Sequence, residues 1–364
     1  MMNNSSADAN GTEEFRNYYE IYAKHSSAIF IDQTVTPLFY VIGLPTNPLC
    51  AYIWLSRKTR ANNSSAIYLG ALSISHVVFL LMHVLQELKY AWNIETYDGH
   101  ASCEIFHMLF YIPQYLAPLV VLGFTVERYI AVCHPFAKAR YCTVRRAAFV
   151  VVSLFVFCVL ISSLQAYFWT YDAEQQSCNH RVQLQTGNFI ELWTWFTELL
   201  LFGVAPLAAL VFNVLVIREI HSLTNCGPAH LGSSGGSQAS TVTLLSISFY
   251  LICTWLPYTI VYSLNRQFPM GDLRMSSEEI SRDPTWQRNF LFNTIRVILT
   301  EITLSNSACY FFIYYATGTH FRDRVHDLLC PKRCIKGSNR HLETKQYIAV
   351  SKSSKSNGTM ITCV

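Results

Sequence analysis

The segment GFTVERYIAVCHPF, residues 123–136, places an acid directly beside a base at the end of a long apolar run. Residues 110–122, FYIPQYLAPLVVL, carry no charge at all. A charge in apolar surroundings is stable only where a partner neutralises it. Arg128 has two potential partners, the adjacent Glu127 and a group outside the chain, and one cation with two alternative partners has the chemistry of a switch. A lone arginine that anchors a helix end would explain neither Glu127 nor Tyr129.

Composition and block length predict an all-α membrane protein. The 364 residues are 51% hydrophobic and only 14% charged, whereas soluble domains carry about 25% charged residues. Each apolar block is long enough to cross a hydrocarbon core of about 30 Å as a helix. A soluble helical bundle would need amphipathic stripes and more polar residues between blocks. The predicted spans are Thr36–Leu55, Ala66–Gln86, Ile105–Val126, Ala147–Trp169, Leu192–Ile217, Thr241–Tyr262 and Phe290–Tyr315.

Charges in the short links predict the orientation. The links after the first and third spans are basic, with no acidic residue: Arg57, Lys58, Arg60, Lys138, Arg140, Arg145 and Arg146. By the positive-inside rule these links are cytoplasmic, so the N-terminus is extracellular and the C-terminus cytoplasmic. The predicted organisation is an extracellular tail over 1–35, a seven-helix bundle over 36–317, a short amphipathic eighth helix over 318–334 and a disordered cytoplasmic tail over 335–364.

Several covalent modifications follow from this topology. Asn3, Asn4 and Asn10 lie in acceptor triplets for N-linked glycan. No cationic start and short apolar run precede them, so the first span is expected to act as its own insertion signal. Cys103 and Cys178 are the two cysteines on the oxidising side and predict a disulfide. Cys330 and Cys334, after the amphipathic segment, are candidates for palmitoylation; a zinc site there is the weaker alternative.

Arg128 is expected at the inner membrane face. It follows Cys103 by 25 residues, which is about 37 Å of helix. If Cys103 lies at the outer face, Arg128 lies where the third span leaves the lipid.

These residues resemble the rhodopsin-like (class A) G-protein-coupled receptors. ERYIAVCHP is similar to the acid-Arg-Tyr signature of that family, and CTWLPY, residues 253–258, is similar to its helix-six motif. NSACYFFIYYATGTHFR, residues 306–322, resembles helix seven and the start of helix eight. Asn47, Pro206 and the cysteine pair fall at the corresponding positions. The resemblance covers nearly the whole chain.

The resemblance implies a transducer of signals rather than an enzyme, with no cofactor, no metal and no nucleic acid partner. It implies a switch that engages a heterotrimeric G protein, formed by Glu127, Arg128, Tyr129 and Tyr314. In that switch Glu127 would hold Arg128 at rest. It also implies an activation relay through Trp255, Pro257, Pro206, Asn47 and Asn306, in which the proline hinge lets helix six swing outward.

Three departures from the family pattern concern its intramembrane sodium pocket. His76, Ala117 and Tyr310 stand where the family has aspartate, serine and asparagine. We therefore expect that sodium does not modulate this chain. The simplest role for His76 is a neutral side chain hydrogen-bonded to Asn306 or Ser307. The cytoplasmic end of helix six, LGSSGGSQAS, offers no acid to hold Arg128, so some ligand-free signalling is expected.

Ionisable and aromatic residues near the outer helix ends predict the ligand site, because lipid does not tolerate unpaired charges. The candidates are Glu87, His107, Phe110, Gln114, Glu198, Trp255, Tyr258, Arg296 and Glu301. Carboxylates with aromatic walls suit a cationic ligand with an apolar end, such as an amidated Arg-Phe peptide. Pairing of Glu301 with Arg296 is the alternative for those two residues.

A narrower resemblance points to the ligand class. GLPTN in helix one, RYIAVCHP after helix three and the helix-seven pattern are similar to invertebrate FMRFamide-like neuropeptide receptors. The alternative is a chemosensory or orphan class A receptor for a small molecule. The tail predicts further partners: its serines are candidate sites for a receptor kinase and arrestin, and Thr362, Cys363 and Val364 match a PDZ ligand. The amphipathic helix is expected to lie on membrane lipid.

Overall fold

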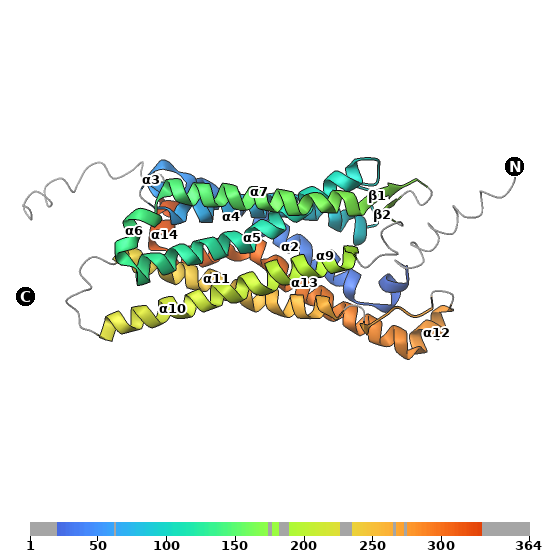
Figure 1. The fold of residues 1–364 in the computed structure, drawn as a ribbon. Coiled ribbons are helices and arrows are strands. Elements are labelled where there is room, and N and C mark those ends of the chain that lie inside the picture. Colours follow the sequence, from blue (N-terminus) through green and yellow to red (C-terminus); the bar gives the residue numbers. More distant parts are fainter. Residues whose placement is uncertain are drawn as a thin grey trace, which may run out of the picture. The chain divides into compact units, whose positions relative to one another are not determined.

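Seven long helices form the transmembrane bundle (Figure 1). The computed structural model describes residues 20–61, 63–173, 177–181, 189–225, 235–264, 267–272 and 275–329. Six of the spans are single helices: α2 (Ala28–Leu55), α4 (Ser65–Tyr90), α5 (Ser102–Cys133), α7 (Val144–Phe168), α11 (Gly235–Ser263) and α13 (Pro284–Thr317). The fifth span combines α9 (Phe189–Glu198), the π-helical turn η1 (Leu199–Val204) and α10 (Ala205–Asn225). All seven predicted spans are confirmed.

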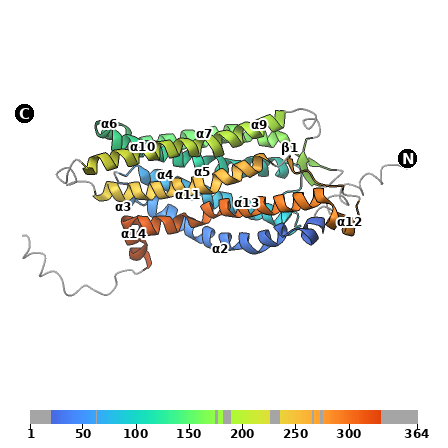
Figure 2. The same ribbon diagram turned by 90° about the horizontal axis from the view of Figure 1, so that it is seen from below.

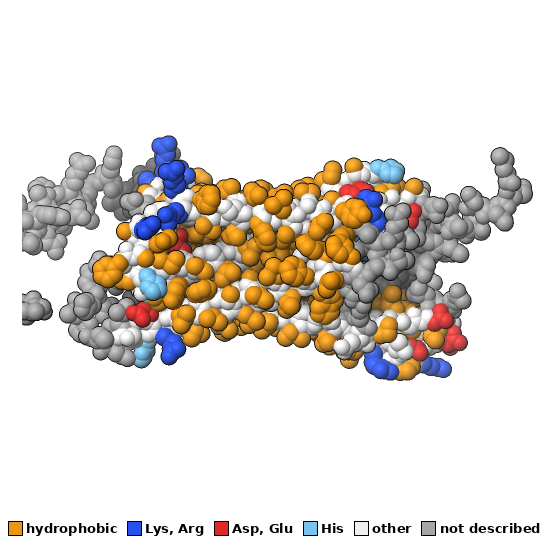
Figure 3. Space-filling model, viewed as in Figure 1, with side chains coloured by type: hydrophobic (Ala, Val, Ile, Leu, Met, Phe, Trp, Pro, Cys, Tyr) orange, Lys and Arg blue, Asp and Glu red, His pale blue; other side chains and the backbone are white. Residues whose placement is uncertain are grey.

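Short elements mark the two ends of the bundle formed by residues up to Phe321. The strands β1 (Trp169–Asp172) and β2 (Ser177–His180) and the helix α12 (Ser277–Arg282) lie at one end, here called the hairpin end. The helices α3 (Arg57–Arg60) and α6 (Pro135–Tyr141) lie at the other, the basic end (Figures 1 and 2). On the face shown in Figure 3, apolar side chains cover the middle and charged side chains gather at both ends.

The eighth helix, α14 (Thr319–Leu329), follows α13 after Gly318. Its sequence is amphipathic, as expected: Phe321, Val325, Leu328 and Leu329 recur at helical spacing. Arg324 and Asp327 form an ion pair of 3.7 Å within the helix. Residues up to Phe321 belong to one compact unit and residues from Arg322 to a second.

Two spans begin earlier than hydropathy alone predicts. The helix α2 starts at Ala28 rather than Thr36, because the charged Asp32 ends the apolar block but not the helix. The helix α13 starts at Pro284, where Asp283 accepts hydrogen bonds from the backbone N–H groups of Thr285 and Trp286, each at 2.8 Å. A carboxylate N-cap followed by proline at the first helical position is a strong helix start.

The fifth span changes register at its proline. Pro206 has no backbone N–H, and just before it the N–H of Ala205 bonds the carbonyl of Leu200, five residues back. The resulting π-helical turn is a common device at functional sites. It places Phe202 against Trp255 of α11, with the two rings stacked at 4.1 Å between centroids.

A polar cluster ties the hairpin to the bundle. The disulfide between Cys103 of α5 and Cys178 of β2 is present, as predicted. Asp98 accepts a hydrogen bond from Lys89 Nζ at 2.5 Å and another from the backbone N–H of Cys178 at 2.9 Å. The Lys89 ammonium also lies 4.6 Å from the centre of the Tyr97 ring. This cluster therefore joins the end of α4, the following link and β2.

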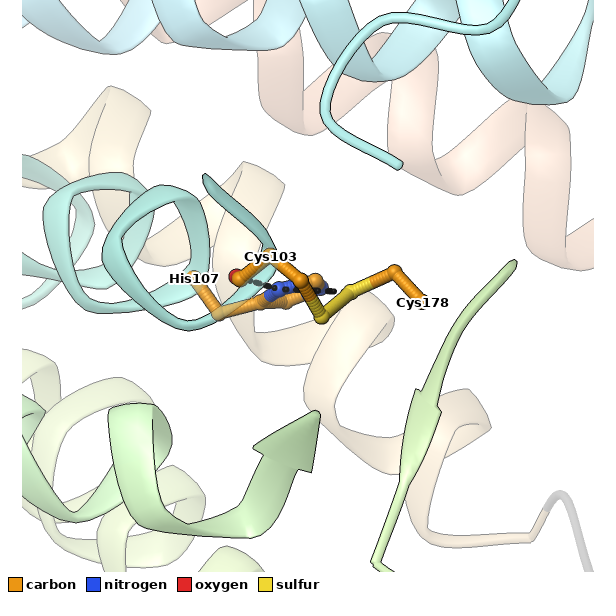
Figure 4. A group of neighbouring side chains, drawn as sticks. All are labelled: Cys103, His107 and Cys178. Carbon is orange, nitrogen blue, oxygen red and sulfur yellow. Dashed lines mark hydrogen bonds between the residues drawn. A yellow bond between two sulfur atoms is a disulfide. The ribbon is translucent and has the colours of Figure 1, made fainter. Parts of the chain in front are cut away.

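His107 lies beside the disulfide rather than in a metal site (Figure 4). Its Nδ1 is 2.9 Å from the carbonyl oxygen of Cys103 and 3.7 Å from the Cys178 sulfur. Three such residues within reach of one another could hold a metal, but the covalent bond removes both thiolates that zinc would need. On β2, burial lowers the pKa of His180, whose ring lies 4.0 Å from that of Trp169.

We predict that Asp98→Asn lowers the stability of the folded bundle by roughly 3 kcal/mol, because it leaves the Lys89 charge buried without its counter-ion. The two side chains are only 10% and 5% exposed. The measurement is thermal unfolding of the purified protein. Glu95→Gln, an exposed acid in the same link, is the control. An unchanged melting temperature for Asp98→Asn would contradict the prediction.

Candidate functional site

A cavity of about 480 Å³ lies within the bundle, toward the hairpin end. Its walls come from α2, α4, α5, α11, α13 and the fifth span. Eight of the predicted ligand-binding residues line it: Glu87, Phe110, Gln114, Glu198, Trp255, Tyr258, Arg296 and Glu301. Residues from six of the seven spans therefore converge on one space, although they are far apart in the sequence.

His107 is the exception among the predicted residues, since it does not line this cavity. Its ring stacks on Trp169 of β1, with centroids 3.7 Å apart and planes within 9°. The hairpin covers His107, so this residue does not reach the cavity that Phe110 and Gln114 of the same helix line.

Asp32 is a cavity residue that the hydropathy pattern did not reveal. It lies in the first turns of α2, ahead of the predicted apolar block. Tyr22, from a helical segment over residues 20–25, also lines the cavity, as does His83 of α4. The sequence could have revealed Asp32, because it lies only four residues before the apolar block that begins at Thr36. A helix that continues one turn beyond that block includes it.

Acidic side chains outnumber basic ones among the described residues that line the cavity. These are the four acids Asp32, Glu87, Glu198 and Glu301, and one guanidinium, that of Arg296. That guanidinium is bound by Asn293 Oδ1 at 2.7 and 3.1 Å.

The predicted alternative, pairing of Glu301 with Arg296, is not what the structure has. Glu301 Oε1 accepts a hydrogen bond from Thr36 at 2.6 Å, and no ion pair joins the two residues in the described part of the chain. The second oxygen of Glu301 and Oε1 of Glu87 are buried without a hydrogen-bond partner among the described residues. Two side chains that line the cavity therefore each have a buried carboxyl oxygen without a donor among the described residues.

Hydroxyl and amide groups connect the cavity floor to the rest of the bundle. Asn306 Nδ2 of α13 donates to Thr254 Oγ1 of α11 at 2.5 Å. Thr303 Oγ1 donates to the Thr254 carbonyl at 3.2 Å, one residue before Trp255. Farther along, Thr317 donates to Thr243 at 2.8 Å. These bonds hold α11 against α13 from the cavity floor to the basic end.

Asn47 fixes α2 to α13 through backbone contacts. Its Nδ2 donates to the carbonyl of Ser307 at 2.6 Å and to that of Gly43 at 2.9 Å. His76 does not make the predicted hydrogen bond to Asn306 or Ser307: its ring packs 5.0 Å from that of Tyr310, and Nδ1 has no partner among the described residues. Tyr310 instead donates to Asn306 Oδ1 at 3.3 Å.

The predicted switch lies at the basic end, and its acid and base are not paired. Glu127 accepts a hydrogen bond from Ser64 at 2.5 Å, and no ion pair between Glu127 and Arg128 occurs in the described chain. The Arg128 guanidinium lies 5.4 Å from the Phe124 ring, with Nε buried and unpartnered. Glu127 and Arg128 still interact electrostatically, and the expectation that Glu127 holds Arg128 at rest stays a prediction. Adjacent helix residues point in different directions, which explains the separation.

Aromatic contacts surround the other two switch residues. Tyr129 packs on His134 and on Phe212 of α10, with centroids 5.4 and 5.3 Å apart. Tyr314 is fully buried and contacts both Trp54 and Phe321 at 5.4 Å. Asn3, Asn4, Asn10, Cys330, Cys334 and the tail from residue 335 lie outside the described residues.

Comparison with known proteins identifies the family. The family described as 7 transmembrane receptor (rhodopsin family) matches residues 47–297. Rat G-protein coupled receptor 183 is 25% identical over 250 residues, covering 67% of this chain and 68% of that protein. Chicken lysophosphatidic acid receptor 6 is 25% identical over 246 residues, covering 64% and 76%. Neuropeptide receptor 18 of Caenorhabditis elegans is 24% identical over 286 residues, covering 70% and 56%.

The family match covers well over half of the chain and agrees with the seven-helix bundle, the disulfide and the order of the motifs. Such receptors are multi-pass proteins of the plasma membrane that respond to an extracellular ligand and act on a G protein; they are not enzymes. This chain belongs to the rhodopsin-like G-protein-coupled receptors.

Proposed function

We propose that this receptor binds an amidated neuropeptide with a cationic side chain in the cavity and activates a heterotrimeric G protein at the basic end. The observation that carries the proposal is the excess of acids over bases among the described lining residues: four acidic side chains share the cavity with one arginine, which is itself bound to Asn293. A buried carboxylate without a counter-charge is costly. A cationic ligand relieves that cost, and an anionic ligand increases it.

Aromatic side chains in the cavity would bind the apolar end of the ligand. Phe110, Trp255 and Tyr258 line the same cavity and suit an apolar or aromatic ligand end. A peptide with a basic residue next to an amidated aromatic residue meets both requirements, and an amidated end adds no negative charge. The invertebrate relative named as a neuropeptide receptor supports a peptide ligand. This is the FMRFamide-like class that the motifs resemble.

A small-molecule or lipid ligand is the second candidate. A volume of about 480 Å³ lies within the range of small-molecule pockets, and another relative is named as a lysophosphatidic acid receptor. A phosphate head group would meet the carboxylates of Glu87 and Glu301 at close range. The electrostatics therefore favour the cationic peptide.

The proposed signal path runs from the cavity floor to Arg128. Trp255 stacks on Phe202 of the π-helical turn, and the neighbouring Thr254 bonds Asn306. Tyr310 and Tyr314 continue the path along α13, with ring centroids 6.2 Å apart. Pro257 gives α11 its hinge. A ligand that moves Trp255 would weaken the α11–α13 contacts and open the basic end, where Arg128 is free to engage the G protein.

The remaining parts of the proposal concern topology and partners. The basic end would be cytoplasmic, because α3 and α6 carry exposed Arg57, Lys58, Arg60, Lys138 and Arg140. The N-terminus would then be extracellular and glycosylated, and the C-terminal tail cytoplasmic. Receptor kinase, arrestin, a PDZ protein and acylation at Cys330 and Cys334 would act on that tail.

We predict that Arg128→Ala abolishes the G-protein response to amidated peptides and leaves their binding intact. Arg128 is about 37 Å of helix from Cys103, so the substitution does not touch the cavity. The measurement is calcium and cAMP signalling in cells with matched surface expression, against a panel of amidated neuropeptides. Lys138→Ala, an exposed basic residue of α6, is the control. An undiminished response in Arg128→Ala would contradict the proposed switch.

We predict that Thr254→Ala raises ligand-free signalling by about fivefold, because losing one hydrogen bond of about 1 kcal/mol weakens the hold of α13 on α11. Asn306 loses the acceptor that lies at 2.5 Å. Ser263→Ala, whose hydroxyl bonds only its own helix at Ile260, serves as the control. Basal activity equal to wild type would show that this contact does not restrain the off state.

A further inference from the structure

We propose that Asp32, Glu87 and Glu301 form a guanidinium subsite, so that the ligand is anchored by an arginine-type group between α2, α4 and α13. This inference deepens the proposed function and rests on it for the peptide that carries the group. The subsite places the cationic end of the ligand on one side of the cavity. The cation that fits there is a guanidinium rather than an ammonium or a metal ion.

The three carboxylates belong together by position. Each lines the same cavity, and each comes from a different helix: Asp32 from α2, Glu87 from α4 and Glu301 from α13. Glu87 interacts electrostatically with both of the others, and Glu301 with Asp32. Glu198 on the fifth span lies apart, with Tyr111, Tyr258 and Tyr262 as its electrostatic neighbours.

Two of the three side chains are built into the wall and left unsatisfied. Glu87 is 9% exposed and Glu301 6% exposed. Thr36 holds Glu301 through Oε1, while Oε2 of Glu301 and Oε1 of Glu87 find no partner among the described residues. Buried polar atoms are nearly always hydrogen-bonded. Unsatisfied acceptors on the wall of a cavity indicate a donor that arrives with the ligand.

The one arginine among the described lining residues does not fill that role. Arg296 is within electrostatic range of Asp32, but its guanidinium is held by Asn293, and it forms no ion pair with the acids in the described chain. Among the described lining residues, three acidic groups therefore share their side of the cavity with at most one guanidinium.

Geometry distinguishes the kind of cation. A metal ion needs its ligand atoms close together, and the three carboxylates are not among the described residues that bring three such atoms within 4.8 Å of one another. An ammonium is a compact point charge, whereas a guanidinium presents five N–H donors in a planar fork. Acceptors spread over three helices suit the fork, which reaches two or three carboxylates at once.

The test uses the purified full-length receptor and two dipeptide probes of equal size. N-acetyl-Arg-Phe-amide carries the guanidinium, and N-acetyl-citrulline-Phe-amide replaces it with a neutral urea. A third probe, with lysine, tests ammonium. The readout is the rise in melting temperature with probe concentration, which gives an apparent Kd. We expect wild type to bind the arginine probe about tenfold or more tightly than the citrulline probe, with the lysine probe between them.

Glu87→Gln and Glu301→Gln should remove the preference for arginine over citrulline. Both should leave the ligand-free melting temperature unchanged or raised, because the neutral amide keeps an acceptor oxygen and breaks no ion pair of the described chain. A purely structural role would lower it. Glu104→Gln is the matched control: this acid of α5 accepts a hydrogen bond from Thr170 at 3.2 Å and does not line the cavity. It should keep the full preference.

Three outcomes would overturn the subsite: equal binding of arginine and citrulline probes, no binding of either at millimolar concentration, or a preference that survives both substitutions but disappears in Glu198→Gln. Signalling separates this from the proposed function. A receptor that binds the arginine probe as expected but is activated by no amidated peptide keeps the subsite and loses the peptide proposal. One that amidated peptides activate equally with arginine or lysine, but not with citrulline, keeps the proposal and loses the guanidinium subsite.

Discussion

The cost of an unpaired charge in hydrocarbon is the constraint on which this structure depends. It explains why the spans are apolar and why charged residues gather at the two ends of the bundle. It also gives meaning to the exceptions. Acids inside the bundle line a cavity rather than lipid, and the buried Lys89 is paired with Asp98. A carboxylate kept there without a partner marks a place where an outside group completes the structure.

The same constraint made most of the fold readable from the sequence. Hydropathy over roughly 20 residues predicts a spanning helix because lipid leaves no other way to satisfy the backbone. The disulfide followed from the topology, since two cysteines shared the oxidising side. Four of the eight candidate ligand-site residues, Glu87, Glu198, Arg296 and Glu301, could be chosen because an ionisable group in a span must face the interior. The sequence did not show which way each side chain points around its helix or at which depth in the bundle it lies.

Three residues show where that limit lies. Asp32 was missed because a charge ends an apolar block in a hydropathy profile, whereas the helix of backbone hydrogen bonds continues through it. His107 shares a helix face with Phe110 and Gln114 by spacing, but the hairpin that covers it is placed by long-range contacts. Glu127 and Arg128 are adjacent in sequence, and adjacent residues of a helix do not face each other on its surface. Only the fold shows that Ser64 is the partner of Glu127.

The π-helical turn Leu199–Val204 changes how this receptor can be aligned with its relatives. A turn with i to i+5 hydrogen bonds holds one residue more than an α-helical turn, so the helix before it is rotated by about 100° relative to an uninterrupted α-helix counted back from Pro206. Glu198 directly precedes the turn. In a relative without such a turn, the residue at the same sequence distance from its proline would point to a different helix. Positions in the fifth span are therefore comparable between receptors only after the turn itself has been aligned, and a carboxylate matched by counting alone would be assigned to the wrong face.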